Sequence, residues 1–361
     1  MHSFISNSRA RAPKESSLTI LLIASFVAIG LLGIFEWRLR EAGFVPNVRD
    51  SMELWAAQRQ RASRLGKRAL ILVGASRLQL AIDIDALRDA TGLEPVQLAI
   101  DGSSNLPVLE DLANDSSVTG TILVSTNARL MLPINKPDRA NEWIEFYNES
   151  FRGLYSPMLE ARLKSLVMEY SALYSSAIPL NLVLSMVSGQ RRTNPLYLIT
   201  KENRERIADY QLVKMPEFYI ARVLRHLGAW DNRLEIGTMG DFNQVAYSAV
   251  ESLPTQDNSD YLSQIANVYT LVRQIEERGG RVGFLRMPTD KWVWEIDEKK
   301  YPRTEFWDLF ASNCPALTFH FKDYAGLNEF NLPDGSHIDK RDKRRFTTNL
   351  AQILGQKLLQ K

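Results

Sequence analysis

Residues 68–77 read Arg-Ala-Leu-Ile-Leu-Val-Gly-Ala-Ser-Arg. The five apolar residues after Arg68 are typical of a strand that is buried on both faces of a parallel sheet. The turn Gly74 to Arg77 then leads into a segment with helical spacing that ends near Gly92. This succession of strand, turn and helix predicts an α/β fold.

Four further apolar segments resemble this first strand. They are residues 96–100, 120–125, 281–287 and 316–321. We expect helices after the second and third strands, near 303–312 and at the chain end, and a helix over 51–65 before the first strand. Parallel strands need crossover connections, which are usually helices, so the pattern predicts one sheet of five parallel strands.

A long segment without this rhythm separates the third and fourth strands. We therefore expect one α/β domain made of residues 66–130 and 281–361, with residues 131–280 as a large, mainly helical insertion. Within it, the spacing of apolar residues predicts helices in 139–172, 203–228 and 260–278.

The insertion also contains an apolar run, Ala177 to Val187, that is too short to span a membrane and includes Pro179. Two interpretations stay open. The run is a buried hairpin segment, or it is a patch that lies on the membrane or lines an acyl pocket.

The N-terminal part of the chain contains a candidate membrane anchor, Leu18 to Phe35, with no charged residue. This run is longer than the apolar part of a signal peptide, and no A-x-A cleavage site follows it. We expect residues 1–17 to be a cytoplasmic tail, 18–35 one transmembrane helix and 36–65 a helical linker. A single-pass protein of the inner membrane, with its catalytic domain in the periplasm or otherwise outside the cytoplasm, is the predicted arrangement.

The composition excludes several classes of function. Lys plus Arg (44) nearly equal Asp plus Glu (42), so the chain lacks the basic surplus of nucleic-acid-binding proteins. One Cys and four His cannot build a disulfide framework or a zinc cluster. We therefore expect no nucleic-acid partner, no zinc cluster and no Cys-rich cofactor site.

The loops at the carboxyl ends of the strands are where ligands bind in an open parallel sheet. Ser76 follows the first strand, where its hydroxyl is exposed at a helix N-terminus, although Ser is also a preferred helix N-cap. Gly102 and Asn127 follow the second and third strands. Both can donate N–H groups to an oxyanion, and both are also ordinary turn residues.

His337 is the one histidine on a loop at this expected edge, in the sequence Asp334-Gly-Ser-His337. A carboxylate three residues before an imidazole can accept the Nδ1–H group and leave Nε2 as a base. The alternative is that Asp334 initiates a turn and His337 caps a helix.

Taken together, these loops resemble the SGNH/GDSL hydrolase superfamily, especially its membrane-anchored, extracytoplasmic bacterial branch. The matching blocks are G-A-S-R with Ser76, D-G-S-S with Gly102, S-T-N-A with Asn127, and D-G-S-H with Asp334 and His337. The family has G-D-S and G-x-N-D where this chain has G-A-S and S-T-N-A. The resemblance implies a three-layer, flavodoxin-like sheet and covers the α/β domain but not the insertion.

The resemblance further implies acyl transfer, with Ser76 as nucleophile, His337 as base and Asp334 as its orienting carboxylate. The Ser76 amide, Gly102 and Asn127 would form the oxyanion hole, and this mechanism requires no metal and no organic cofactor. Arg77, next to Ser76, is placed to hold an anionic group of the substrate; the alternative is an exposed arginine in the first turn of a helix. The expected function is a serine esterase or O-acyltransferase, whose partner is an acylated envelope or secreted glycan or another small ester.

Two other functions stay open. A non-catalytic scaffold or assembly protein of an envelope polysaccharide machinery would also explain the degenerate blocks. A Rossmann-type nucleotide enzyme is the weaker alternative, because G-A-S-R contains neither G-x-G-x-x-G nor a P-loop lysine.

Overall fold

A five-stranded sheet forms the centre of the computed structural model, which describes residues 14–132, 138–175, 196–213 and 247–359, with 249 and 252 excepted. The strand order is β2-β1-β3-β6-β7, and every adjacent pair is parallel. The strands are Ala69–Val73 (β1), Glu94–Gln97 (β2), Thr121–Ser125 (β3), Arg281–Arg286 (β6) and Leu317–His320 (β7). The predicted α/β fold with a parallel sheet is confirmed.

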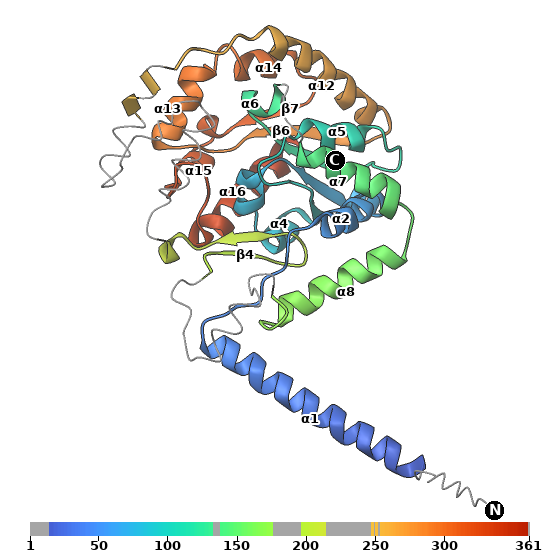
Figure 1. Cartoon of the computed structure of the whole chain (residues 1–361). Coiled ribbons are helices and arrows are strands. Elements are labelled where there is room, and N and C mark those ends of the chain that lie inside the picture. The colour runs from blue at the N-terminus through green and yellow to red at the C-terminus, as the bar shows by residue number, and fades with distance from the viewer. Residues whose placement is uncertain are drawn as a thin grey trace, which may run out of the picture.

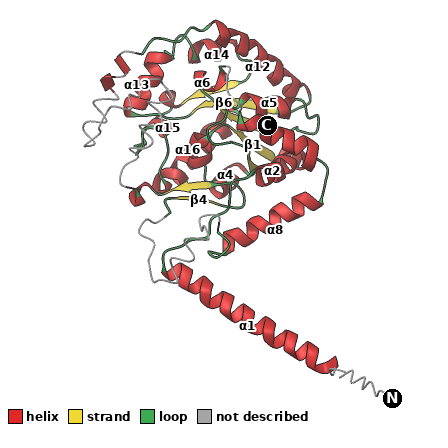
Figure 2. Cartoon of the chain, viewed as in Figure 1, coloured by secondary structure: helices red, strands yellow, loops and turns green. Residues whose placement is uncertain are grey.

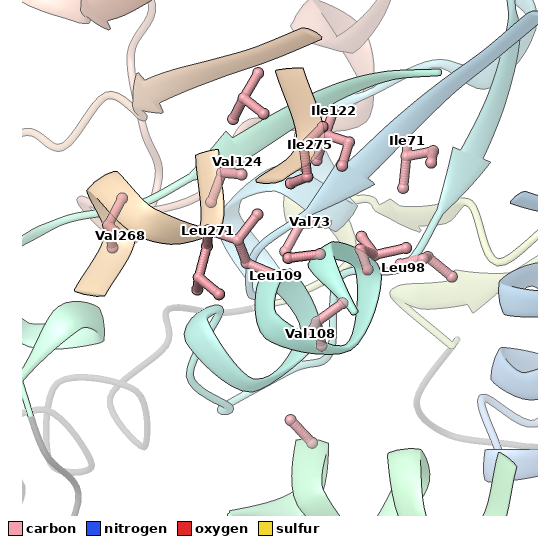
Figure 3. Packing of buried hydrophobic residues seen from close by; sticks show 14 of the residues in the cluster. Ile71, Val73, Leu98, Val108, Leu109, Ile122, Val124, Val268, Leu271 and Ile275 are labelled. Carbon is pink, nitrogen blue, oxygen red and sulfur yellow. The ribbon is translucent and has the colours of Figure 1, made fainter. Parts of the chain in front are cut away.

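Helices cover both faces of this sheet (Figure 2). Because successive strand side chains point to opposite faces, Leu70 and Leu72 enter one apolar core, and Ile71 and Val73 enter the other. The first core is closed by α3, α4 and α16, which are Ser76–Ala81, Ile84–Thr91 and Lys340–Lys357. The second is closed mainly by α2, α5 and α12, which are Met52–Leu65, Leu106–Ala113 and Ser259–Glu277. Figure 3 shows α5 and α12 side chains against Val73, Ile122 and Val124.

The order of the strands indicates where a ligand would bind at the edge of the sheet. Counted along the chain, the five strands have the order 2-1-3-4-5, in which connections diverge on either side of β1. In open parallel sheets, ligands bind at such a switch point, beyond the carboxyl ends of the strands. The loops after β1 and β3 carry Ser76 and Asn127, so both residues lie at this edge.

The remaining helices of the α/β domain differ in detail from the sequence prediction. The expected helix after Ser76 is two helices, because the Asp83 side chain accepts a hydrogen bond from Ala86 N and starts α4 anew. The helix expected near 303–312 is α14, Trp307–Asn313, and an additional helix α13, Lys291–Lys300, precedes it. Short helices are α6 (Ala128–Met131) and α15 (Ala325–Asn328), with 3₁₀ turns Gly66–Arg68 and Phe321–Asp323.

The insertion contains both helices and strands. Its helices are α7 (Arg139–Phe146) and α8 (Ser156–Tyr170), joined through a π-helical turn, Tyr147–Phe151. The short strands β4 (Leu198–Thr200) and β5 (Arg206–Ala208) form an antiparallel hairpin, followed by a 3₁₀ turn, Tyr210–Leu212. The helix α12 also falls within residues 131–280, but it packs on the sheet of the α/β domain. It follows β3 and precedes β6 in the chain, and its buried side chains join the core on one face of the sheet.

The prediction of a helix over 203–228 is wrong for residues 203–213, and the reason is tertiary. Arg204 has a left-handed backbone (φ 64°) and a fully buried guanidinium. That group donates to Asp50 Oδ1 (2.7 Å) and to the carbonyl oxygens of Gln97 (2.8 Å) and Ala99 (3.0 Å). These bonds hold the hairpin against the end of β2 and outweigh the local helical spacing. The run 177–187 lies outside the described residues.

The N-terminal helix α1 (Lys14–Glu41) extends away from the α/β domain (Figure 1). Its segment Ser17–Glu41 is long and apolar enough to cross a membrane, and none of its most apolar stretch is buried in the protein. The expected span 18–35 lies inside this helix.

Candidate active site

Ser76 is the first residue of α3, directly after the turn that ends β1. The turn is tight because Gly74 packs against β3: a Cβ added to it would lie 2.9 Å from the Ser125 Cβ atom. The Ser76 side chain makes no helix-capping bond. Its Oγ atom instead lies 2.9 Å from His337 Nε2, so the structure does not give Ser76 the N-cap role.

His337 is held by the loop that connects to α16. Asp334 Oδ1 accepts hydrogen bonds from Ser336 N (2.9 Å) and His337 N (2.8 Å), and Gly335 has the left-handed φ of 73° that this turn needs. His337 Nδ1 lies 2.8 Å from Asp334 Oδ2. The helix α16 is capped by Asp339, not by His337. The structure therefore brings Ser76, His337 and Asp334 into one hydrogen-bonded chain.

The carboxylate of Asp334 is buried and fully engaged, with 4% of its surface exposed. Burial alone would raise its pKa, but the positive charge of His337 and hydrogen bonds from His337 and Tyr210 outweigh this effect and hold the pKa well below its usual range. The group is consequently ionised at neutral pH, as an acceptor for the Nδ1–H group must be. With the proton held on Nδ1 by this hydrogen bond, the lone pair of Nε2 is directed at the Ser76 hydroxyl.

Tyr210 contributes a fourth member that sequence reasoning missed. Its hydroxyl donates to Asp334 Oδ2 at 2.7 Å, and its backbone N donates to Asp339 Oδ2 at 2.9 Å. The residue follows the hairpin β4–β5, which belongs to the insertion. A Tyr in a segment expected to be helical gives no signal of this contact, because the contact depends on how the hairpin packs against the Asp334 loop.

The two other candidate oxyanion donors lie on loops next to the Ser76 turn. The loop after β2 is joined to it by the Ile100 N to Gly74 O hydrogen bond (2.9 Å), and Gly102 follows with φ 71°. Asn127 caps α6, with its Oδ1 atom accepting from Leu130 N at 3.0 Å. This cap uses the side-chain oxygen and leaves the amide Nδ2 as the group that can donate.

Arg77 lies beside the nucleophile candidate and is tied to the same loop as His337. Its Nε donates to Ser336 Oγ at 2.8 Å, and its Nη1 lies 3.6 Å from Asp297 Oδ2. The same Asp297 oxygen also pairs with the buried Arg286. Two guanidinium groups share this carboxylate, and the Glu298 carboxylate also lies close enough to Arg286 to act on it electrostatically.

Comparisons with known proteins add no family to this geometry. No protein-family model matches the chain, and no curated protein matches its sequence significantly. Within the part of the chain that the structure describes, no group of three or more His, Cys, Asp or Glu side chains is arranged to hold a metal ion. What the described residues offer for chemistry is the Ser76–His337–Asp334 chain and its surroundings.

Proposed function

We propose that the protein is a membrane-anchored serine esterase or O-acyltransferase of the SGNH type, acting on acyl esters of envelope or secreted glycans. The observation that carries the proposal is the hydrogen-bonded chain from Ser76 Oγ through His337 to Asp334 Oδ2. A hydroxyl is a weak nucleophile at neutral pH until a base removes its proton, and an imidazole oriented by a carboxylate is suited to that task.

The proposed reaction is an acyl transfer in two halves. His337 Nε2 accepts the hydroxyl proton while Ser76 Oγ bonds to the acyl carbon, and the tetrahedral oxyanion accepts hydrogen bonds from the Ser76 amide, Gly102 and Asn127. The ester C–O bond then breaks, and His337 returns the proton to the departing alcohol. Water or a sugar hydroxyl next attacks the acyl-serine, giving its proton to His337, and Ser76 leaves with that proton.

Arg77 supplies the proposed contact with an anionic substrate. Its position next to Ser76 puts a positive charge within one residue of the reacting hydroxyl, and the Asp297 carboxylate that Arg77 contacts is shared with Arg286. An acidic glycan or a charged acyl ester would gain from this charge, whereas a neutral ester would not.

For the location, we propose that α1 anchors the chain in the inner membrane and that the catalytic domain lies in the periplasm. The length and apolar character of Ser17–Glu41 support the anchor. A reporter fused after Lys361 tests the orientation: a phosphatase that is active outside the cytoplasm should give signal. A signal from a cytoplasmic reporter alone would contradict the proposal.

The activity is tested with full-length protein in detergent and a short-chain aryl ester. Wild-type protein should release the aryl alcohol, and Ser76→Ala should reduce the rate by at least about 10³-fold. Ser312→Ala removes an exposed hydroxyl on α14 and serves as the control with wild-type rate. Folded wild-type protein that is no faster than Ser76→Ala on aryl and glycan esters would favour the scaffold function instead.

A further inference from the structure

The helix α8 exposes a row of large apolar side chains, although Met158 on the same helix packs against the core. The residues that it buries are small, Ala161 and Ser165, and they lie on the side that faces α2. Leu159, Leu163 and Val167 are exposed by 56%, 55% and 49% of their surface. Residues spaced by four lie on one helix face, so these three form a continuous stripe. The side chains of this stripe are therefore not used in packing against the α/β domain.

The stripe is extended at both ends by aromatic residues. Tyr170 is 74% exposed and follows Val167 by three positions, and Tyr155, also 74% exposed, precedes Leu159 by four. Exposed Arg162, Lys164 and Glu160 flank the stripe. An apolar face with aromatic ends and charged flanks is the pattern of helices that lie in the interface of a membrane.

The C-terminal end of α8 is bonded to the end of α1. Arg40 donates to the Tyr170 carbonyl oxygen at 2.9 Å, and Glu36 accepts from the backbone N atoms of Ala172 (2.7 Å) and Leu173 (2.8 Å). Leu39, Phe44 and Ala172 close a small apolar cluster around this joint. In Figure 1, α8 lies on the side of the domain that faces α1, and the two helices diverge from this joint.

The depth of this joint follows from the length of α1. The segment Ser17–Glu41 has 25 residues, or about 37 Å at 1.5 Å per residue, and so exceeds a hydrocarbon layer of about 30 Å. The surplus at its C-terminal end, with Trp37, Arg38 and Arg40, falls in the headgroup region. Because Arg40 holds Tyr170, the end of α8 lies at that same depth.

We propose that α8 is a second membrane contact, an interfacial helix whose stripe of Leu159, Leu163 and Val167 rests in the headgroup and acyl boundary of the bilayer that α1 crosses. The occupant of the exposed face is lipid. Two contacts, one spanning and one lying flat, fix the domain against the membrane surface instead of leaving it to swing on a single helix. This inference is independent of the proposed chemistry.

The test uses the full-length chain in lipid nanodiscs that hold one copy each. In a Cys314→Ala background, Leu163→Cys is labelled with the environment-sensitive dye NBD. Lipids that carry a doxyl quencher near the headgroup should reduce its emission by about twofold or more, because the dye touches lipid. Leu262→Cys is the matched control and should not be quenched, because Leu262 is exposed and belongs to α12, a helix on the opposite side of the domain from α1 in Figure 1.

A second variant, Leu159→Cys, is labelled in the same way to exclude an effect that is specific to the Leu163 substitution. The doxyl lipid should quench its NBD emission as it quenches that of Leu163→Cys. Emission typical of water at both positions would overturn the proposal. Blue-shifted emission without quenching by the doxyl lipid would also overturn it, because the stripe would then be covered by protein, such as a second copy. Neither result depends on whether the chain hydrolyses esters.

Discussion

Replacing Tyr210 by Phe removes one hydroxyl and leaves the ring in place. The lost bond is the 2.7 Å donation to Asp334 Oδ2, the oxygen that also accepts from His337 Nδ1. Tyr210 touches no reacting atom, so its proposed role is to position and electrostatically tune the Asp334–His337 pair. Because Tyr210 follows the hairpin β4–β5 of the insertion, the variant tests whether this hairpin contributes to the active site.

The size of the effect follows from the other donors to Asp334. A hydrogen bond to a charged group contributes about 1.5–3 kcal/mol, and the lower end applies here because Ser336 N, His337 N and His337 Nδ1 remain. About 1.5 kcal/mol corresponds to a rise of about one unit in the pKa of Asp334. The carboxylate thus stays ionised at neutral pH, and the rate at the pH plateau should fall by less than about tenfold.

The pH dependence of ester hydrolysis should be a more sensitive measure of this substitution than the rate at the pH plateau. Without the Tyr210 hydroxyl, the negative charge of Asp334 Oδ2 is stabilised by one donor fewer, which raises the pKa of Asp334. The pH profile of kcat/KM should therefore change on its acid side, where the Asp334–His337 pair takes up protons. Ester hydrolysis measured on this acid side, with Tyr324→Phe as a control that removes a hydroxyl bonded to Lys357, gives the change.

The stability of the same variant supplies a second measurement with a defined sign. Because the pKa of folded Asp334 is below its unfolded value, its stabilisation is complete above about pH 4 and is lost as pH falls through the folded pKa. Tyr210→Phe should unfold more easily at pH 7, and the difference should shrink in acid. A wild-type pH profile together with a wild-type unfolding temperature would refute the reasoning.

Three further predictions concern the surroundings of the site. Asn127→Ser keeps an oxygen to cap α6 but removes the amide donor, so kcat should fall by about 10²-fold without loss of stability; an unchanged kcat would confine Asn127 to its capping role. Arg77→Gln should raise KM for an anionic ester and leave KM for a neutral aryl ester alone, and equal effects on both would exclude charge recognition. Lys343→Met removes one of the two lysines that pair with the buried Glu205; because Lys201 still pairs with this carboxylate, the cost in urea unfolding should stay below about 3 kcal/mol, and a larger loss would show that Lys201 does not compensate.

The sheet and its order of loops were accessible from the sequence because they depend on local patterns. Five apolar segments and the loops after them predicted where Ser76 and His337 would lie, since a parallel sheet gathers those loops at one edge. The Asp334 turn was equally local, because carboxylate and imidazole are three residues apart. Both features need only chain connectivity and residue type.

The insertion was less predictable because its structure depends on distant partners. Residues 203–213 have helical spacing, yet the buried Arg204 guanidinium takes its acceptors from Asp50 and from the end of β2. The Tyr210 hydroxyl likewise meets a carboxylate 124 positions later in the chain. The outward face of α8 was also hidden, because apolar spacing does not tell which side of a helix the domain covers.

Covalent labelling with a fluorophosphonate tests the central claim most directly, since this reagent phosphonylates a hydroxyl that a base has activated. Wild-type protein should be labelled at Ser76, as peptide mapping would show, and Ser76→Ala and His337→Ala should each lose the label while remaining folded. The double variant should hydrolyse esters no more slowly than either single one, because the side chains act as a unit. Folded protein that hydrolyses an ester yet labels equally well after Ser76→Ala would contradict the assignment.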